Sequence, residues 1–302
     1  MARTRFIKDT GLTVRMTSVM FLLGALFVAL VVALMYVFRG YAPLIALVGI
    51  GIAFAQWWMS DKLAMKAMGA REVTPEQAPE LHGMIDRLCS LADMPKPRVA
   101  VADTPLPNAF ATGRSPSRSV VCVTIGILHT LTTEELEGVI AHELSHVAHR
   151  DVLVMTVASS AGILAGLVTR GASWGGLGRS RNNNNAAFGF FAVLLVSLVV
   201  YAVSFLALRL LSRYRELCAD RSGAYLTQRP SALASALQKI TNQISATPQQ
   251  DLRAAQTMNA FFIAPAVRGL SLRTLTSTHP TLEQRLDQLA KIAAELGRPY
   301  DG

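Results

Sequence analysis

The chain has 302 residues, of which 51% are hydrophobic and only 16% are charged. Its formal net charge of +9 is compatible with nucleic-acid binding, but no nucleic-acid recognition motif accompanies that charge. Many basic residues instead flank long apolar runs, where Lys and Arg meet lipid headgroups and set the membrane orientation. The composition therefore predicts an integral membrane protein and argues against a nucleic-acid partner.

Two apolar runs near the N-terminus, 19–38 and 41–58, predict a membrane hairpin. The first is long enough to cross a hydrocarbon core of about 30 Å at about 1.5 Å per residue. A signal peptide is the alternative, but the run exceeds a typical signal core of about 7–15 residues and no Ala-x-Ala-like site follows. Arg39-Gly40 makes a tight turn into the second run, which ends in Trp57 and Trp58 at an expected interface.

The distribution of basic residues predicts the orientation of this hairpin. Four basic residues precede it, and Lys62, Lys66 and Arg71 follow it, whereas the turn between the two runs carries only Arg39. By the positive-inside rule, the N-terminus and everything after Trp58 lie in the cytosol. The three cysteines, Cys89, Cys122 and Cys218, agree with a reducing compartment, because they have no paired spacing typical of disulfides or of a zinc ribbon.

A soluble segment follows, from about residue 72 to residue 150. Thr74-Pro75 is predicted to open a helix, and Pro95 and Pro97 to end it. One face of this helix is apolar and comprises Leu81, Met84, Ile85 and Leu88. Residues 98–102 and 119–125 are β-rich, and 108–113 with 114–118 indicate a short strand and a turn.

Two further apolar runs, 152–169 and 188–211, are separated by a Gly- and Asn-rich loop at 171–187. The run 152–169 contains Gly162-x-x-x-Gly166 and two serines, and is the weaker spanning candidate. The final ninety or so residues are predicted to be soluble and mainly helical, with Leu282, Leu286 and Leu289 forming an apolar stripe. The predicted division is therefore 1–71, 72–151, 152–211 and 212–302.

The pentapeptide His142-Glu143-Leu144-Ser145-His146 is the motif that carries chemistry. Residues four apart on a helix share one face, so His142 and His146 can bind one zinc ion, and Glu143 can act as a base toward its water. Thr132-x-x-Glu135 is a capping box, and the apolar residues between it and the motif continue a helical face. Two incidental histidines on a surface helix are the alternative.

A catalytic zinc usually has three protein ligands, so a third ligand is needed. The pattern with a third histidine six residues on fails, because Val152 occupies that position. Glu216 is the best candidate, since it directly follows the run 188–211, and Asp220 lies one turn further on, where it can orient a ligand imidazole. From spacing alone, the alternative that both are ordinary solvated acids is left open.

At these residues the chain resembles the HtpX family of membrane metalloproteases, which are relatives of the CAAX prenyl proteases. The quoted segments are Asn108-Ala-Phe-Ala, the thirteen residues from Glu134 to His146, Arg150-Asp151, Glu216-x-x-x-Asp220 and Ser277-Thr-His-Pro280. The resemblance implies that Glu216 is the third zinc ligand, with one ion per chain. It also implies an α+β, predominantly α-helical integral membrane protein. About four transmembrane helices would accompany a cytosolic zincin-like (gluzincin) catalytic domain with a small β-sheet.

The resemblance further implies roles for three residues. Asn108 would lie on an edge strand that pairs with an extended substrate backbone. His279 and Arg285 would approach the cleft, where either can stabilise the oxyanion or hold substrate carbonyls. The alternatives are a turn residue for Asn108, a helix-entry residue for His279 and a surface charge for Arg285. Of the other histidines, His149 is predicted to be interfacial, and His82 and His129 to lie on the surface.

These inferences predict a zinc metalloendopeptidase of the plasma or inner membrane, with its catalytic domain on the cytoplasmic side. Its partners would be protein or peptide substrates and the lipid bilayer, and its activity would be quality control of misfolded or damaged membrane proteins. A selective prenyl-protein-type protease and a catalytically silent membrane scaffold or chaperone are the alternatives. A transporter is disfavoured, because the apolar runs lack the charges expected along a transport path.

Overall fold

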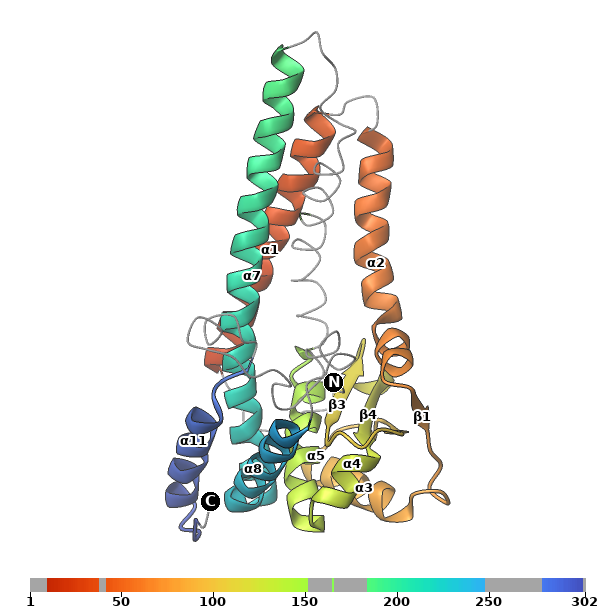
Figure 1. The fold of residues 1–302 in the computed structure, drawn as a ribbon, viewed down its shortest axis with the longest axis vertical. Helices are drawn as coiled ribbons and strands as arrows, with labels where there is room; N and C mark the ends of the chain where they lie inside the picture. The colour runs from red at the N-terminus through yellow and green to blue at the C-terminus, as the bar shows by residue number, and fades with distance from the viewer. Residues whose placement is uncertain (1–9, 38–41, 152–164, 166–183, 248–278, 301–302) are drawn as a thin grey trace. The chain divides into compact units, whose positions relative to one another are not determined.

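The computed structural model describes residues 10–37, 42–151, 165, 184–247 and 279–300 (Figure 1). The chain divides into two compact units. Unit 1 comprises Met1–Leu12, Ser60–Val152 and Ser212–Gly302, and unit 2 comprises Thr13–Met59 and Leu153–Leu211. Each unit is built from segments far apart in the sequence, because the chain leaves unit 1 and returns to it twice.

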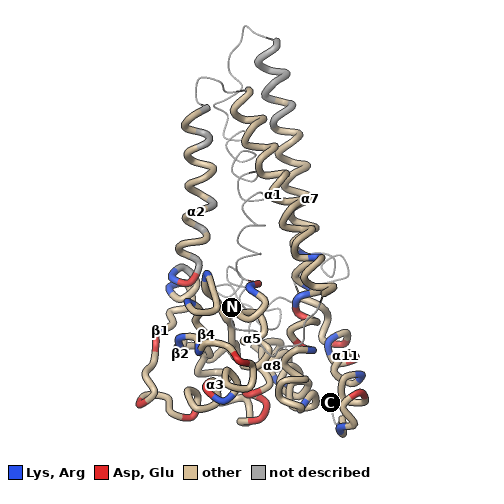
Figure 2. Tube along the Cα trace, turned by 180° about the vertical axis from the view of Figure 1, so that it is seen from behind, with Lys and Arg blue, Asp and Glu red and all other residues tan. Residues whose placement is uncertain are grey.

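Unit 2 consists of long apolar helices. They are α1 (Thr10–Val37), the first part of α2 (Ala42–Ala67) and the first part of α7 (Asn184–Thr227). Helices α1 and α7 pack through Leu30, Leu34 and Val200, while outward-facing apolar side chains such as Phe21 and Phe191 are largely exposed. Few charged residues interrupt these helices (Figure 2). An apolar outer surface of this kind is suited to lipid rather than to water.

Two described helices are long and apolar enough to cross a membrane, Thr10–Tyr36 and Leu194–Thr227. They contain most of the predicted runs 19–38 and 188–211. Residues 42–58 of the predicted run 41–58 belong to α2, whose described apolar part, Leu47–Met59, is shorter than a span. The run 152–169 lies outside the described residues apart from Ala165, as does most of the loop 171–187. Four spans therefore remain a prediction.

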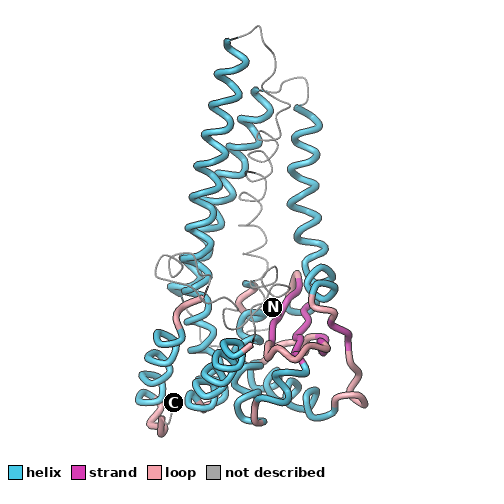
Figure 3. The backbone as a smooth tube through the Cα atoms, viewed as in Figure 1, coloured by secondary structure: helices cyan, strands magenta, loops and turns pink. Residues whose placement is uncertain are grey.

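Unit 1 contains a four-stranded sheet with the order β1-β2-β4-β3 (Figure 3). The strands are β1 (Ala70–Glu72), β2 (Arg98–Ala102), β3 (Ala109–Gly113) and β4 (Ser119–Thr124). Strand β2 pairs with β4 in parallel, whereas β1 with β2 and β3 with β4 are antiparallel. The predicted strand 98–102 is confirmed, and the predicted strand 119–125 is confirmed as far as Thr124, since Ile125 begins the helix that follows. Strand β3 forms one edge of the sheet. Val120, Val121 and Val123 of β4 are fully buried.

The core of unit 1 surrounds α5 (Thr133–Ala148), which carries the His-Glu-x-x-His motif. Helix α5 packs against α3 (Pro79–Ala92), α8 (Pro230–Ala246) and the strands β3 and β4, while the short α4 (Ile125–Thr130) packs against β4 and α8. Because α5 is buried along most of its length, the motif is held inside the protein and not displayed on its surface. The final helix α11 (Leu282–Glu295) packs against α8 and begins with a capping box between Thr281 and Gln284.

Helix α3 begins later than the sequence predicts. Thr74-Pro75 is predicted to open it, but the helix starts at Pro79, because Thr74 is the first residue of a turn that precedes the helix. The Thr74 carbonyl accepts the N–H groups of Gln77 and Ala78, and the Gln77 side chain accepts the Thr74 N–H. The predicted apolar face is confirmed, since all four of its residues are buried.

Helix α7 contains residues of both units, since the boundary lies between Leu211 and Ser212. It runs for 44 residues without interruption, from the apolar run through Glu216 and Asp220 to Thr227. At about 1.5 Å per residue, the residues after Leu211 extend this helix by roughly 24 Å. The predicted membrane run and the predicted third ligand therefore belong to one helix.

Candidate active site

The local sequence fixes the position of α5. The Thr132 side chain accepts the Glu135 N–H, and the Glu135 carboxylate accepts the Thr132 N–H at 2.9 Å, which confirms the predicted capping box. The Glu135 carboxylate also accepts hydrogen bonds from Ser235 and Lys239 of α8. These contacts anchor the start of the motif helix to α8.

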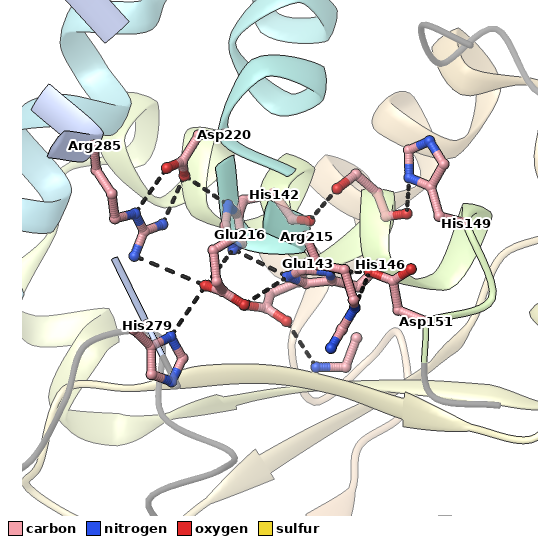
Figure 4. A network of polar contacts seen from close by, with 12 residues as sticks. His142, Glu143, His146, His149, Asp151, Arg215, Glu216, Asp220, His279 and Arg285 are labelled. Carbon is pink, nitrogen blue, oxygen red and sulfur yellow. Dashed lines mark hydrogen bonds and ion pairs between the residues drawn. The ribbon is translucent and has the colours of Figure 1, made fainter. Parts of the chain in front are cut away.

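His142, His146 and Glu216 converge on one point (Figure 4). Nε2 of His142 lies 3.2 Å from Nε2 of His146. Oε2 of Glu216 lies 3.7 Å from Nε2 of His142, and Oε1 of Glu216 lies 3.5 Å from Nε2 of His146. All three side chains are buried. The structure therefore brings a residue of α7 to two residues of α5 that lie 70 and 74 positions before it.

The spacing of these three ligand atoms fits zinc. Nitrogen and carboxylate ligands lie about 2.0–2.2 Å from a tetrahedral zinc ion, which places neighbouring ligand atoms about 3.4 Å apart. Two imidazoles and one carboxylate leave the fourth position open, as catalytic zinc sites do. The observed separations of 3.2–3.7 Å thus match a zinc ion held by His142, His146 and Glu216.

The first ligand is held by what we call the His142 network, comprising His142, Asp220 and Arg285. Nδ1 of His142 lies 2.9 Å from Oδ1 of Asp220. Arg285 donates from Nε and Nη2 to the two Asp220 oxygens at 2.7 and 2.6 Å. Asp220 and Arg285 are 0% and 2% exposed. The bidentate pair keeps a buried carboxylate charged beside the imidazole, because each oxygen has a guanidinium donor.

The second ligand has a corresponding partner set, the His146 network, comprising His146, Asp151 and Arg215. Nδ1 of His146 lies 2.7 Å from Oδ2 of Asp151, and Nε of Arg215 lies 2.9 Å from the same oxygen. Sequence reasoning assigned no role to Asp151 or Arg215. A signal was present, since Asp151 follows His146 by five residues, but only the turn that ends α5 brings its side chain back to the ring.

The balance of buried charge around the cluster also fits a divalent cation. Four buried carboxylates surround it, those of Glu143, Asp151, Glu216 and Asp220. The described arginines in contact with them, Arg215 and Arg285, supply two positive charges. Burying unpaired charge is costly, so the remaining deficit of two positive charges favours a dication.

The environment of His142 also favours positive charge at the cluster. Burial lowers its pKa, but hydrogen bonds to Asp220 and Glu216 outweigh burial and raise the pKa to about 9. The imidazole without an ion is therefore protonated at neutral pH, and binding of a metal displaces that proton. The site is built to accept positive charge, either as protons or as a metal ion.

Glu143 lies between the metal ligands and the sheet. Its Oε2 accepts the backbone N–H of Ala111, in the edge strand β3, at 2.9 Å. Burial raises the pKa of the Glu143 carboxyl, against the opposing effect of the two histidines. A carboxyl group with a raised pKa can take up a proton more readily than an exposed one, which suits a general base.

The contact with Glu143 also shows which backbone groups of β3 face away from β4. The Asn108 carbonyl accepts the Thr124 N–H, so Asn108 faces β4, whereas the Ala111 N–H points to the other side. Backbone groups alternate along a strand, so those of Ala109, Ala111 and Gly113 face away from β4. Among the described strands, β4 is the one partner of β3, and this second side forms the edge of the sheet.

A glycine allows α7 to approach α5 at the site. A Cβ atom at Gly223 would lie 3.0 Å from the backbone nitrogen and 3.2 Å from the Cα of His142. Both are backbone atoms of a buried helix, so they cannot move aside as a flexible side chain can. Gly223 thereby contributes to the close approach of the two helices that carry the ligands.

The structure places the remaining predicted residues at varying distances from the metal ligands. His279 is buried, with Nδ1 3.2 Å from Oε2 of Glu216. Asn108 is buried directly before β3, where its N–H donates to Oγ1 of Thr124. Arg285 is buried, with Nη1 4.0 Å from Oε2 of Glu216, and its surroundings are not those of a surface helix charge.

Three further histidines lie outside the metal cluster. His149 ends α5 and lies 2.8 Å from the Ser145 carbonyl oxygen through Nδ1. His129 is exposed, as predicted. The prediction that His82 lies on the surface is wrong, because His82 is 8% exposed and its Nε2 lies 3.0 Å from the Val73 carbonyl oxygen.

The fold and this site together define a zinc metallopeptidase with two histidine ligands, a glutamate ligand and a glutamate base. Comparison with known proteins agrees: the model of "Peptidase family M48" matches residues 75–293. "Protease HtpX homolog 1" of Streptomyces coelicolor is 52% identical over 98% of this chain and 97% of that protein. "Protease HtpX homolog" of Moorella thermoacetica is 46% identical over 97% of this chain and 98% of that protein. The chain belongs to peptidase family M48 and, within it, to the HtpX membrane proteases.

A solved structure shares the fold. The crystal structure of S. mikatae Ste24p matches with a TM-score of 0.53 over 92% of this chain and 65% of that chain. The sequence identity is 16%, so this likeness concerns the fold alone. The predicted resemblance to HtpX proteases, the zinc cofactor and the metalloprotease class are confirmed.

Proposed function

We propose that this HtpX-type protease is an endopeptidase that cleaves misfolded or damaged membrane proteins at segments reaching its cytosolic side. The observation that carries the proposal is the course of α7. Glu216, a zinc ligand, follows Leu211, the end of the predicted apolar run, by only five residues of the same helix. A metal ligand so close to the end of an apolar helix favours substrates that leave the membrane nearby.

The chemistry of the proposed reaction is peptide hydrolysis without a covalent intermediate. His142, His146 and Glu216 would hold the zinc ion, which when bound would supply a Lewis acid for the scissile carbonyl and would lower the pKa of a water toward about 7. In this proposal Glu143 takes the proton from the attacking water and passes it to the leaving amine. The Ala111 N–H supports this role, since it holds one oxygen of the carboxylate in a fixed place.

We further propose that the substrate backbone pairs with β3. The outward backbone groups of Ala109 and Ala111 offer it a donor and acceptors, as in other cases of strand addition to a sheet edge. The backbone of Asn108 is engaged with Thr124, so the proposed contact of Asn108 with substrate falls to its side chain. A peptide bound here would pass directly over Glu143.

His279, Asp220 and Arg285 complete the proposed machinery. His279 lies against the ligand carboxylate, where it can stabilise negative charge that develops on the scissile carbonyl oxygen. Asp220 would orient His142 through Nδ1. Arg285 would act chiefly through Asp220, because two of its nitrogens are engaged there, with Nη1 left toward the ligand side and any substrate carbonyl.

The membrane arrangement is part of the proposal. The runs 19–38, 41–58, 152–169 and 188–211 would form about four spans, with the N-terminus and the catalytic residues in the cytosol. The segments 72–151 and 212–302 would together form the catalytic domain. Both contribute ligands to the single proposed zinc ion, which is consistent with this division.

Glu143→Gln is the variant that tests the reaction. We expect the purified variant in detergent to retain wild-type zinc content and to lose cleavage of an unfolded protein, because the amide cannot accept a proton. Wild-type cleavage should be abolished by a chelator. Cleavage by Glu143→Gln at the wild-type rate would contradict the assigned base. The quality-control role requires a separate test, in which membrane proteins accumulate in cells that express Glu143→Gln and not in cells that express wild type.

A selective prenyl-protein-type protease is the second candidate, because the site segments resemble a family related to the CAAX prenyl proteases. It predicts that the protein cleaves a prenylated C-terminal peptide and leaves unfolded proteins intact. The matched unprenylated peptide is the control. Zinc in both wild type and Glu143→Gln, with no cleavage of any of these substrates by either, would instead favour a membrane scaffold.

A further inference from the structure

Each of the two zinc-ligating imidazoles directs one ring nitrogen to the metal position and the other to a carboxylate. Each presents Nε2 to the cluster, since the two Nε2 atoms lie 3.2 Å apart. Each directs Nδ1 to an aspartate, His142 to Asp220 and His146 to Asp151. The His142 partner is expected from the Glu-x-x-x-Asp spacing. The His146 partner is not part of any helical spacing, and its origin lies in the end of α5.

The turn after α5 brings Asp151 to His146. A continuing helix turns about 100° per residue, so a residue five positions on would point about 140° away from His146. The helix instead ends at Ala148, and Arg150 adopts a φ of +58°. Its N–H donates to the Val147 carbonyl at 3.1 Å. A left-handed conformation costs a residue other than glycine about 1–2 kcal/mol, and here it reverses the chain toward the ring.

Arg215 supplies the charge that a buried carboxylate needs. Asp151 is 1% exposed, and its Oδ2 lies near both Nδ1 of His146 and Nε of Arg215. Arg215 immediately precedes Glu216 in α7, so the helix that provides the third ligand also provides the cation that balances Asp151. Figure 4 shows the three side chains of the His146 network on the side of the cluster opposite Arg285.

We propose that Asp151, which lies between His146 and Arg215, is a positioning residue that fixes the orientation of the His146 ring for zinc binding. The Asp151 carboxylate accepts a hydrogen bond from Nδ1–H of His146, which leaves the lone pair of the ring on Nε2, directed at the metal position. Without it the ring can place its proton on Nε2 and cease to bind. The proposal concerns the zinc site and does not depend on the identity of the substrate.

Asp151→Asn tests the proposal, because it keeps the shape of the side chain and removes its charge. We expect zinc to bind about 10–100-fold more weakly, measured by chelator competition on the full-length protein in detergent. The visible absorption of the cobalt-substituted protein should also change, since it reports ligand geometry. Asp86→Asn is the matched control, because Asp86 is exposed on α3 and pairs with Lys96. Wild-type zinc affinity and cobalt spectrum in Asp151→Asn would overturn the proposal.

A pair of Arg215 variants decides the matter if Asp151→Asn does not fold. Arg215→Gln removes the positive charge and should weaken zinc binding by about tenfold. Arg215→Lys restores a positive charge within reach of Asp151 and should recover part of that affinity. Recovery by lysine supports a charge that acts through Asp151, because packing alone would not distinguish glutamine from lysine in this way. Equal, wild-type affinity in both Arg215 variants would overturn the proposal.

Discussion

The two histidine ligands are held by networks of similar chemistry and different construction. The His142 network joins three helices that are distant in sequence, α5, α7 and α11, and its Asp220–Arg285 pair is bidentate. The His146 network is partly local, because Asp151 follows His146 by five residues, and one arginine nitrogen contacts the carboxylate. Disturbing the His142 network should therefore affect folding as well as metal binding, whereas disturbing the His146 network should affect mainly the metal.

Removal of Glu216 affects both networks and should have the largest effect. We expect Glu216→Ala to lose bound zinc and chelator-sensitive proteolysis, because two imidazoles alone do not make a catalytic site. Zinc content measured by mass spectrometry, with cleavage of an unfolded protein, checks this. Glu283→Ala, which removes an exposed carboxylate from α11, is the control and should behave as wild type. Full zinc occupancy in Glu216→Ala would show that another residue is the third ligand.

Asp220→Asn should show most clearly that the His142 network contributes more to folding stability than the His146 network. It removes the carboxylate that pairs with two nitrogens of the buried Arg285 guanidinium, and breaking such a buried pair costs about 3–5 kcal/mol. We therefore expect a lower free energy of unfolding in detergent as well as weaker zinc binding. Asp151→Asn, measured in parallel, should lose less stability, since Arg215 is the more exposed arginine. A larger loss of stability in Asp151→Asn would reverse the comparison.

Gly223→Ala should have an intermediate effect, because it presses α7 against the backbone at His142. Overpacking of this kind costs about 1–3 kcal/mol, and a shift of α7 would also displace Glu216 from the histidines. Unfolding in detergent and zinc affinity should fall together. Gly83→Ala in α3 is the matched control, since a Cβ there meets nothing within 4 Å. That variant should be neutral or more stable, because alanine favours a helix.

Thr132→Ala should have the smallest effect on stability, and it should not distinguish the two networks. It removes the N-cap of α5, which carries both histidines, at a cost of about 1 kcal/mol. We expect slightly lower stability and unchanged zinc affinity, measured as for the other variants. A large loss of zinc affinity would mean that the orientation of the motif helix depends on its cap more than on packing.

Local patterns in the sequence were sufficient for much of unit 1. The His-Glu-x-x-His spacing, the Thr132–Glu135 capping box and the strands 98–102 and 119–125 each involve residues within a few positions of one another. Their helical or extended periodicity is therefore visible in one segment. Where the local signal was ambiguous, prediction was less accurate. Thr74 begins a turn before α3, and His82 is buried by packing that its own helix does not reveal.

The sequence by itself determined the chemistry of the protein: a zinc-binding helix with its base, apolar runs able to span a membrane, and a short list of acids for the third ligand. Only the tertiary structure decided which side chains meet. It brought Glu216 to the histidines, turned Asp151 back onto His146 and placed the Ala111 N–H on Glu143. The physical reason is that periodicity reports the neighbours of a residue along one element. Contacts between α5, α7 and β3 instead depend on how whole elements pack.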